Sequence, residues 1–326
     1  MSASPLPGAA RADTLPKSHA SNGTNTMLPL LAFCLAFAEP PAFTAPGAKV
    51  EKLWGEGSFT EGPVEGPDGA VYFSDIGDRI MKFDPKTGKT TAFRDPSGRS
   101  NGLKFDSMGR LLACEGANTG GRRRISRTEK DGTIRSLADA FDGKKFNAPN
   151  DLTLDAKGRV YFTDPRYVGD EPLELTRESV YRIDADGSVH EVIRDVKKPN
   201  GLVFAPDGKT LYLAQSERVA EGTTRKLLAY PANADGSFGA KKELHDFGQQ
   251  RGIDGMTVAA DGTIVATAGS KDTAGIYFFS PEGKKLGFLA TPEDPSNCCF
   301  GGAEKNILYI TAGKSLYRVT LTLKGK

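Results

Sequence analysis

The chain has 326 residues, of which 38% are apolar and 26% charged, proportions that are ordinary for a globular protein with a substantial core. Its formal net charge of +2 predicts neither nucleic acid nor an acidic membrane surface as a partner. The 38 glycines and 20 prolines favour a protein that is built with many tight turns.

The amino terminus reads as a segment that is separate from the folded protein. The first 26 residues are rich in Ser, Ala, Pro and Asn and are predicted to be disordered. Met27 begins an apolar run that is too short to span a bilayer and ends in the small-x-small pattern Ala36-Phe37-Ala38. We therefore expect a disordered leader with a signal peptide in residues 1–38, export to the periplasm or the exterior, and no stable membrane insertion. The alternative to export is a cytoplasmic location. A separate alternative is that translation begins at Met27.

In the rest of the chain, a polar residue stands eight positions ahead of a turn at six places. A short apolar segment such as 202–204 separates the two members of each pair, so the polar side chains occupy equivalent positions at the start of equivalent strands. A closed ring of such repeats would point them at a common axis. The pairs are Glu61 with Gly69, Asn101 with Gly109, Asn150 with Gly158, Asn200 with Gly208, Asp254 with Gly262, and Asn297 with Lys305.

Further strand-like segments follow each turn, for example 70–73 and 80–83 in the first repeat, and they are rich in β-branched and aromatic residues. The turns recur every 40 to 54 residues, which is the period of four-stranded propeller blades, and apolar periodicity is near two. The sequence therefore predicts one all-β domain over residues 39–326, a six-bladed β-propeller of four-stranded antiparallel blades. The segment 49–54 precedes the first repeat, and we expect it to supply the outer strand of the last blade.

The polar ring has the chemistry of a cation site. Carboxylate and amide oxygens are hard donors, and no His or Cys joins them in register, which favours Ca²⁺, Mg²⁺ or Mn²⁺. Glu61 and Asp254 carry two negative charges that would repel each other on a partly desolvated axis and that one divalent cation would neutralise. The structural alternative is that the dipeptides beginning at Asn101, Asn200 and Asp254 are simple hairpin turns, although each repeat already has its hairpin eight residues later.

Five motifs resemble the SMP-30/gluconolactonase/LRE-like family, and the run 101–116 is similar to its bacterial gluconolactonase-type members. The likeness extends from about Trp54 to the end of the chain. The motifs are Thr60-Glu61-Gly62-Pro63, Pro149-Asn150-Asp151-Leu152, Tyr161-Phe162-Thr163-Asp164-Pro165, Pro199-Asn200-Gly201-Leu202 and Ile253-Asp254-Gly255-Met256.

Members of this family are six-bladed propellers with a central divalent ion, commonly calcium, and many hydrolyse sugar lactones or related esters. The resemblance implies that one divalent cation is bound here, with Ca²⁺ first and Mg²⁺, Mn²⁺ or Zn²⁺ as alternatives. It also implies that Asp254 serves as a general base. The implied metal ligands are Glu61, Asn150, Asn200 and Asp254.

The predicted activity is hydrolysis of a sugar lactone, in which the ion polarises the lactone carbonyl and a water attacks it after losing a proton to Asp254 or binding to the metal. The predicted substrate contacts come from the ring and from the loops that open on its face. The alternative for the two carboxylates among them is that they hold their own loops. Asn101 and Asn297 stand in ring register but are not usual ligands in the family, so they are expected either to support the ligands from behind or to contact substrate. The predicted contacts are Asn101, Glu115, Asp164, Tyr167 and Asn297.

Other functions remain as rivals at this stage. The chain has no GxSxG motif, and His190 and His245 fall in predicted outer strands, which argues against a serine triad. An ester or phosphotriester hydrolase on the same site, and a non-catalytic propeller that uses the metal to bind a partner, are the alternatives. The expected partner is a small-molecule sugar lactone, and the oligomeric state is left open.

Overall fold

The structure is a computed structural model that describes residues 43–117, 120–217 and 224–326. The predicted leader and signal peptide lie outside the described residues, so export stays a prediction. Residues Glu39–Lys326 cluster as one unit. No helix in the described ranges has the length and apolar character that a membrane crossing needs.

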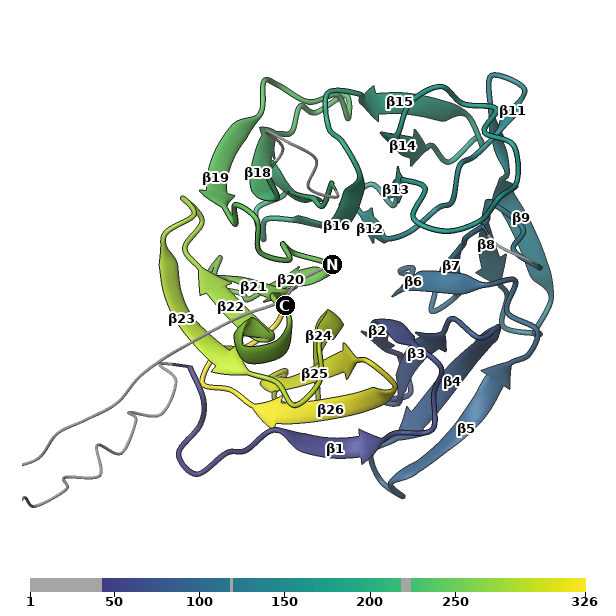
Figure 1. Cartoon of the computed structure of the whole chain (residues 1–326). Helices are drawn as coiled ribbons and strands as arrows, with labels where there is room; N and C mark the ends of the chain where they lie inside the picture. The colour runs from purple at the N-terminus through teal and green to yellow at the C-terminus, as the bar shows by residue number, and fades with distance from the viewer. Residues whose placement is uncertain (1–42, 118–119, 218–223) are drawn as a thin grey trace, which may run out of the picture. The chain divides into compact units, whose positions relative to one another are not determined.

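The described strands form six four-stranded antiparallel sheets around a central axis, which confirms the predicted all-β, six-bladed propeller (Figure 1). From the axis outward, the first blade contains β2 (Thr60–Glu65), β3 (Val71–Asp75), β4 (Arg79–Asp84) and β5 (Lys89–Arg94). The second contains β6 (Ser100–Phe105), β7 (Leu111–Glu115), β8 (Arg124–Thr128) and β9 (Ile134–Ala138). The third contains β12 (Leu152–Leu154), β13 (Val160–Asp164), β14 (Ser179–Ile183) and β15 (Val189–Ile193).

The second half of the ring repeats the pattern. The fourth blade contains β16 (Pro199–Phe204), β17 (Thr210–Gln215), β18 (Lys226–Pro231) and β19 (Lys242–Asp246). The fifth contains β20 (Met256–Val258), β21 (Ile264–Ala268), β22 (Gly275–Phe279) and β23 (Lys285–Ala290), with a short 3-10 helix, η1 (Lys271–Thr273), between β21 and β22. A two-stranded hairpin, β10 (Ala140–Phe141) and β11 (Lys144–Lys145), follows the second blade.

The sixth blade closes the ring with strands from both ends of the folded unit. Its inner three strands are β24 (Pro295–Gly301), β25 (Ile307–Ala312) and β26 (Ser315–Thr320). Its outer strand is β1 (Glu51–Trp54), which pairs antiparallel with β26 and confirms the predicted role of this segment. The ring of Trp54 then packs edge-on against Phe73 of the first blade, with the ring centroids 5.4 Å apart.

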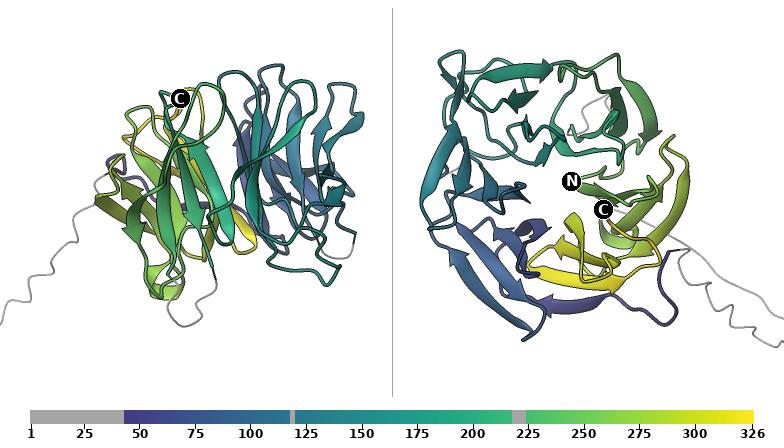
Figure 2. Two further views of the ribbon diagram at one scale, coloured as in Figure 1. Left: turned by 90° about the horizontal axis from the view of Figure 1, so that it is seen from above. Right: turned by 180° about the vertical axis from the view of Figure 1, so that it is seen from behind.

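The core lies between neighbouring blades, where the apolar faces of adjacent sheets meet. Val265 and Phe278 of the fifth blade, for example, are fully buried against Leu308 and Ile310 of the sixth. Because every blade is covered on both faces, its middle strands read as nearly continuous apolar runs, as in a sheet that is buried on both sides. The strands of each blade run between the two faces of the ring, so the loops gather at those faces (Figure 2).

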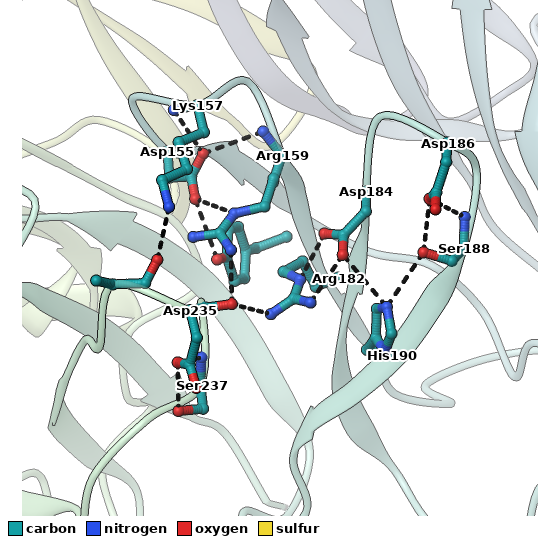
Figure 3. A network of polar contacts seen from close by, with 12 residues as sticks. Asp155, Lys157, Arg159, Arg182, Asp184, Asp186, Ser188, His190, Asp235 and Ser237 are labelled. Carbon is teal, nitrogen blue, oxygen red and sulfur yellow. Dashed lines mark hydrogen bonds and ion pairs between the residues drawn. The ribbon is translucent and has the colours of Figure 1, made fainter.

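Polar contacts also join neighbouring blades, as in the network between the third blade and a hairpin of the fourth (Figure 3). Arg159 and Arg182 both donate to the backbone carbonyl of Asp235, at 2.7 and 3.0 Å. Arg182 also binds Asp184, which lies 3.2 Å from the Nε2 atom of His190 on the outermost strand β15. His190 therefore contacts an interblade structural network, far from the strands that line the axis.

Candidate active site at the propeller axis

A cavity of about 630 Å³ opens at one end of the axis and is lined by loops from all six blades. This is the size of a pocket that holds a small organic ligand. Six of the residues predicted as site residues from sequence lie in its wall or floor. They are Glu61, Asn101, Asn150, Tyr167, Asn200 and Asp254.

A local irregularity places several of these residues at the start of the innermost strands. In β2 the pairing with β3 shifts by one position after Glu61, and β6 and β16 show the same shift around Asn101 and Asn200. In β24 the shift lies just before Asn297. Such a bulge bends a strand and redirects the side chains beside it. The repeated eight-residue spacing therefore corresponds to a repeated backbone feature.

The glycine after the polar residue joins adjacent blades at the axis. The backbone N–H of Gly201 donates to the carbonyl of Asp254 at 2.7 Å, and that of Gly102 donates to the carbonyl of Asn150 at 2.8 Å. A Cβ at Gly201 would lie 2.5 Å from the carbonyl oxygen of Asp254. These dipeptides are therefore contacts between blades, and the simple-turn alternative does not hold because the hairpins lie at positive-φ glycines such as Gly208.

The carboxylate of Asp254 is held by two neighbours on the cavity floor. Its Oδ1 atom accepts from the amide nitrogen of Asn200 at 2.7 Å, and its Oδ2 atom accepts from Arg251 at 2.5 Å. Arg251 is itself fixed by donating to the backbone carbonyls of Gly269 and Pro295 at 3.0 and 2.8 Å. The side chain of Asp254 remains 17% exposed, so it is both oriented and accessible.

Glu61 is the second carboxylate on the floor and is only 4% exposed. Its Oε2 atom accepts a hydrogen bond from the backbone N–H of Gly62 at 3.0 Å. Burial raises the pKa of Glu61 well above its ordinary value, and the negative charges of Asp254 and Asp151 raise it further. Burial also raises the pKa of Asp254, although Arg251 and Asn200 oppose this change. A positive charge between the two carboxylates would relieve both effects.

The donor set fits an oxygen-preferring divalent cation. Two carboxylates, Glu61 and Asp254, and two amides, Asn150 and Asn200, line the same cavity. Carboxylate and amide oxygens are what Ca²⁺ and Mg²⁺ bind, and the two negative charges balance one such ion. Among the described residues, no group of three or more His, Cys, Asp or Glu side chains could hold a metal ion.

Comparison with known proteins identifies the family. A model of the SMP-30/Gluconolactonase/LRE-like region matches residues 59–314. This chain belongs to that family. The match contains the first five blades, β24 and β25 of the sixth, and all of the residues on the cavity floor.

Individual members of the SMP-30/gluconolactonase/LRE-like family are similar over most of their length. The gluconolactonase of Zymomonas mobilis is 31% identical, over 83% of this chain and 80% of that protein. A pentonolactonase of Haloferax volcanii is 29% identical, over 77% of this chain and 80% of that protein. A solved gluconolactonase structure from Xanthomonas campestris superimposes with a TM-score of 0.76 at 29% identity, covering 87% of this chain and 95% of that one.

Tyr167 is a cavity residue with a defined donor. Its hydroxyl donates to the carbonyl of Lys198 at 3.2 Å, and the Nζ atom of Lys198 lies 5.6 Å from the centre of the Tyr167 ring. Burial raises the pKa of Tyr167 well above its ordinary value. The phenol is therefore neutral and forms part of the cavity wall.

Three predicted substrate contacts lie outside the cavity lining. Glu115 is fully buried and forms ion pairs with Arg94 and Arg124. Asp164 is also fully buried, and its carboxylate accepts from the backbone N–H groups of residues 147 and 148 at 2.7 and 2.8 Å. Burial raises the pKa of Asp164 to about 7. Both carboxylates hold loops, which was the alternative weighed for them, and their placement adds no support for contact with substrate.

Asn297 lies below the cavity floor. Its amide nitrogen donates to the Oδ2 atom of Asp151 at 3.3 Å, which joins the sixth blade to the third across the axis. Both side chains are buried, with 6% exposure each. The prediction that Asn297 contacts substrate is therefore also without support from its position.

Sequence reasoning missed the arginines of this site. Arg99, Arg225 and Arg251 all line the cavity, but none of them stands in the repeated position of the polar ring. Arg251 could have been found, because it precedes Asp254 by three residues in the same loop. Arg225 could not, because its position depends on how the loop before β18 folds.

Proposed function

We propose that this protein hydrolyses sugar lactones and that Glu61, Asn150, Asn200 and Asp254 hold one divalent cation, with Ca²⁺ as the first candidate. The observation that carries the proposal is the meeting of these two carboxylates and two amides on the floor of one open cavity. The lactonase names of the relatives over most of the chain support the same activity.

When bound, the cation would supply Lewis-acid polarisation of the lactone carbonyl. The chain's own residues would then orient the reacting groups. Arg251 and Asn200 hold the Asp254 carboxylate in one orientation, so it can accept a proton from a water beside the carbonyl carbon. Asp254 is the group that we propose as general base.

In the proposed reaction the water oxygen forms a bond to the carbonyl carbon while its proton passes to Asp254. The ring C–O bond then breaks as the proton held by Asp254 passes to the ring oxygen, which leaves as a hydroxyl and returns Asp254 to its carboxylate form. The product is the open-chain sugar acid. Asn101 and Tyr167 lie where they can hydrogen-bond the sugar hydroxyls, since both line the cavity beside the proposed metal ligands.

Turnover of a lactone panel tests the proposal directly. Purified protein would be assayed with glucono-1,5-lactone, galactono-lactone and xylono-lactone, with the spontaneous rate subtracted. Treatment with a chelator should abolish turnover, and adding back Ca²⁺, Mg²⁺, Mn²⁺ or Zn²⁺ one at a time should restore it. A metal-loaded protein that opens none of the lactones but cleaves a phosphotriester or a simple ester would replace this proposal with the corresponding rival.

A further inference from the structure

The charges in the cavity wall point to the kind of substrate it accepts. Three carboxylates and three guanidinium groups line it, so the lining alone is formally neutral. A bound divalent cation would leave the loaded cavity with a formal excess of two positive charges. The charged lining residues are Glu61, Asp254, Asp294, Arg99, Arg225 and Arg251.

Arg225 is built into this wall as a fixed positive charge. Its Nε atom donates to the carbonyl of Glu217 at 3.2 Å, and its Nη1 atom donates to the carbonyls of Gln249 and Gln250 at 3.1 and 2.9 Å. Its stem lies over Gly252, where a Cβ would come within 2.6 Å of the Arg225 Cβ. The guanidinium group is therefore held in place before any substrate arrives.

These bonds leave the charge of Arg225 uncompensated. All three acceptors are neutral carbonyls, and none of the carboxylates in the described ranges forms an ion pair with this arginine. Nε and Nη1 are engaged, so the N–H groups of Nη2 remain as donors. Arg251 differs, because its guanidinium is already paired with Asp254 on the floor. Arg225 is thus the cationic side chain at the fourth blade whose Nη2 group can donate hydrogen bonds to an anionic ligand.

Apolar side chains line the cavity at the first and third blades. They include Phe59 and Val168, which are 41% and 56% exposed, together with Ile76 and Pro149. Arg99 lies beside them and donates to the carbonyl of Ile76 at 3.1 Å. The C–H face of a sugar ring can pack on such a wall, while a charged group on the same molecule would turn toward the fourth blade. These apolar side chains, together with the guanidinium of Arg225 at the fourth blade, suit a sugar with one anionic end.

We propose that the lactone carries an anionic substituent, a carboxylate, phosphate or sulfonate, and that Arg225 binds it. Guanidinium groups bind these anions with charge-assisted hydrogen bonds, and a guanidinium held in advance loses little freedom on binding. The inference rests on the proposed lactone hydrolysis, because it names the class of lactone that the same cavity takes.

The test compares matched substrates on the metal-loaded protein. The kcat/KM of glucono-1,5-lactone would be measured beside those of its 6-phosphate, its 6-deoxy-6-sulfo analogue and glucaro-1,4-lactone. We expect at least one anionic lactone to exceed the neutral one by about tenfold or more, the worth of one charge-assisted contact. Added NaCl should lower this ratio, since salt screens the attraction.

Two substitutions at Arg225 assign the effect. Arg225→Gln should reduce the anionic-to-neutral ratio about tenfold, mainly by raising KM for the anionic lactone, and Arg225→Lys should keep part of it. Arg135→Gln is the control, since this arginine lies on the outer strand β9 with 65% of its side chain exposed. If Arg225→Gln does not fold, the Lys variant and the salt dependence decide.

The outcomes separate the inference from the proposed function. Turnover of the neutral lactone with no preference for any anionic one would overturn the inference and leave the lactonase proposal standing. A preference that survives Arg225→Gln would also overturn it, because another group would then bind the anion. Failure to open any lactone would overturn both.

Discussion

Asp254 is bound on both carboxylate oxygens by groups of the protein itself, one from Asn200 and one from Arg251. The first bond comes from another proposed ligand and the second from a residue anchored to two backbone carbonyls. Such a carboxylate cannot rotate freely, so the group that we propose as proton acceptor and cation ligand is held in one position. This preorganisation is what an efficient proton transfer requires.

Replacing Asp254 with Asn should therefore reduce kcat by about 10²- to 10⁴-fold, because an amide cannot accept the proton from water. The measurement is steady-state lactone hydrolysis in a pH-stat with excess divalent ion. Asp186→Asn is a matched control, because Asp186 lies on the exposed β14–β15 hairpin and an Asn oxygen can accept the same bond from Ser188. Undiminished activity in the Asp254 variant would remove this residue from the mechanism.

Glu61 predicts how stability of the metal-free protein varies with pH. Its pKa is raised in the folded state from an ordinary value of 4.5, so the folded state binds more protons than the unfolded state above that pH. The free energy of unfolding of the metal-free protein should therefore fall as pH rises from 4.5 toward the raised pKa of Glu61. The Tm of chelator-treated protein should be lower at pH 8 than at pH 5.5, and Glu61→Gln should reduce the difference.

Metal addition gives the complementary result. At pH 8, Ca²⁺ should raise the Tm of the wild-type protein, because an ion that binds only the folded state stabilises it. The Glu61→Gln variant has one negative charge fewer in the proposed site, so the same Ca²⁺ concentration should raise its Tm less. Equal shifts in both proteins would place the ion away from Glu61.

Most residues of the cavity floor could be predicted from sequence because they recur in register. Glu61, Asn150, Asn200 and Asp254 stand eight residues before a turn, and the structure brings all four to one cavity. Glu115 and Asp164 do not stand in this repeated position. They were predicted as substrate contacts because they lie in loops that open on the same face. Their burial depends on partners such as Arg94 and the N–H of Asn147, which the local sequence does not reveal.

The innermost strands show why a small residue follows the polar one at the axis. Neighbouring blades approach so closely there that Gly201 and Gly255 contact the next blade directly. Sequence alone allowed these dipeptides to be turns, since Asn-Gly and Asp-Gly favour hairpins. The hydrogen bonds from these glycines to the next blade decide the matter, and they depend on how the blades pack rather than on the local sequence.

Gly201→Ala should test this contact. The added Cβ would meet the carbonyl of Asp254 at 2.5 Å, so the variant should lose about 1–3 kcal/mol of unfolding free energy and most of its activity. Chemical denaturation measures the first effect. Gly239→Ala is the control, because its nearest neighbour would be Pro231 at an ordinary 3.4 Å. A Gly201 variant as stable and active as the control would mean that the blades can separate at no cost.

Outer strands were the elements that the sequence predicted least well. The inner and middle strands carry clear apolar runs because both faces are covered, but β5, β9 and β19 are largely exposed. An exposed strand has no buried face, so its sequence lacks the apolar residues whose spacing would indicate a strand. The hairpin β10–β11, with two residues in each strand, left no recognisable pattern either.

At the scale of the whole ring, Trp54 lies at the closure between the first and last blades. It is the single Trp of the chain, and it ends the strand that pairs with β26. Its fluorescence therefore reports on the point where the ring would open. The closure itself was predictable, because 49–54 had strand character and no blade of its own.

Trp54→Ala should lower the unfolding free energy by about 2 kcal/mol, less than a fully buried Trp would cost because Trp54 is only half-buried. Phe93→Ala is the control, since Phe93 is 41% exposed on the outer strand β5. Thermal melts followed by circular dichroism compare the two. A loss no larger for Trp54 than for Phe93 would show that the closing strand contributes little.

The contact between Asn297 and Asp151 spans the axis beneath the cavity floor. On its far side lies another cavity of about 510 Å³, at the hairpin face, and among the described residues the two cavities have no lining residue in common. Because the Asn297–Asp151 contact lies between them, we expect reactant and product to use the same opening of the active-site cavity. Immobilising the protein on a solid support through its hairpin face would leave the cavity opening accessible to substrate. Immobilising it through the opposite face would block that opening and reduce turnover.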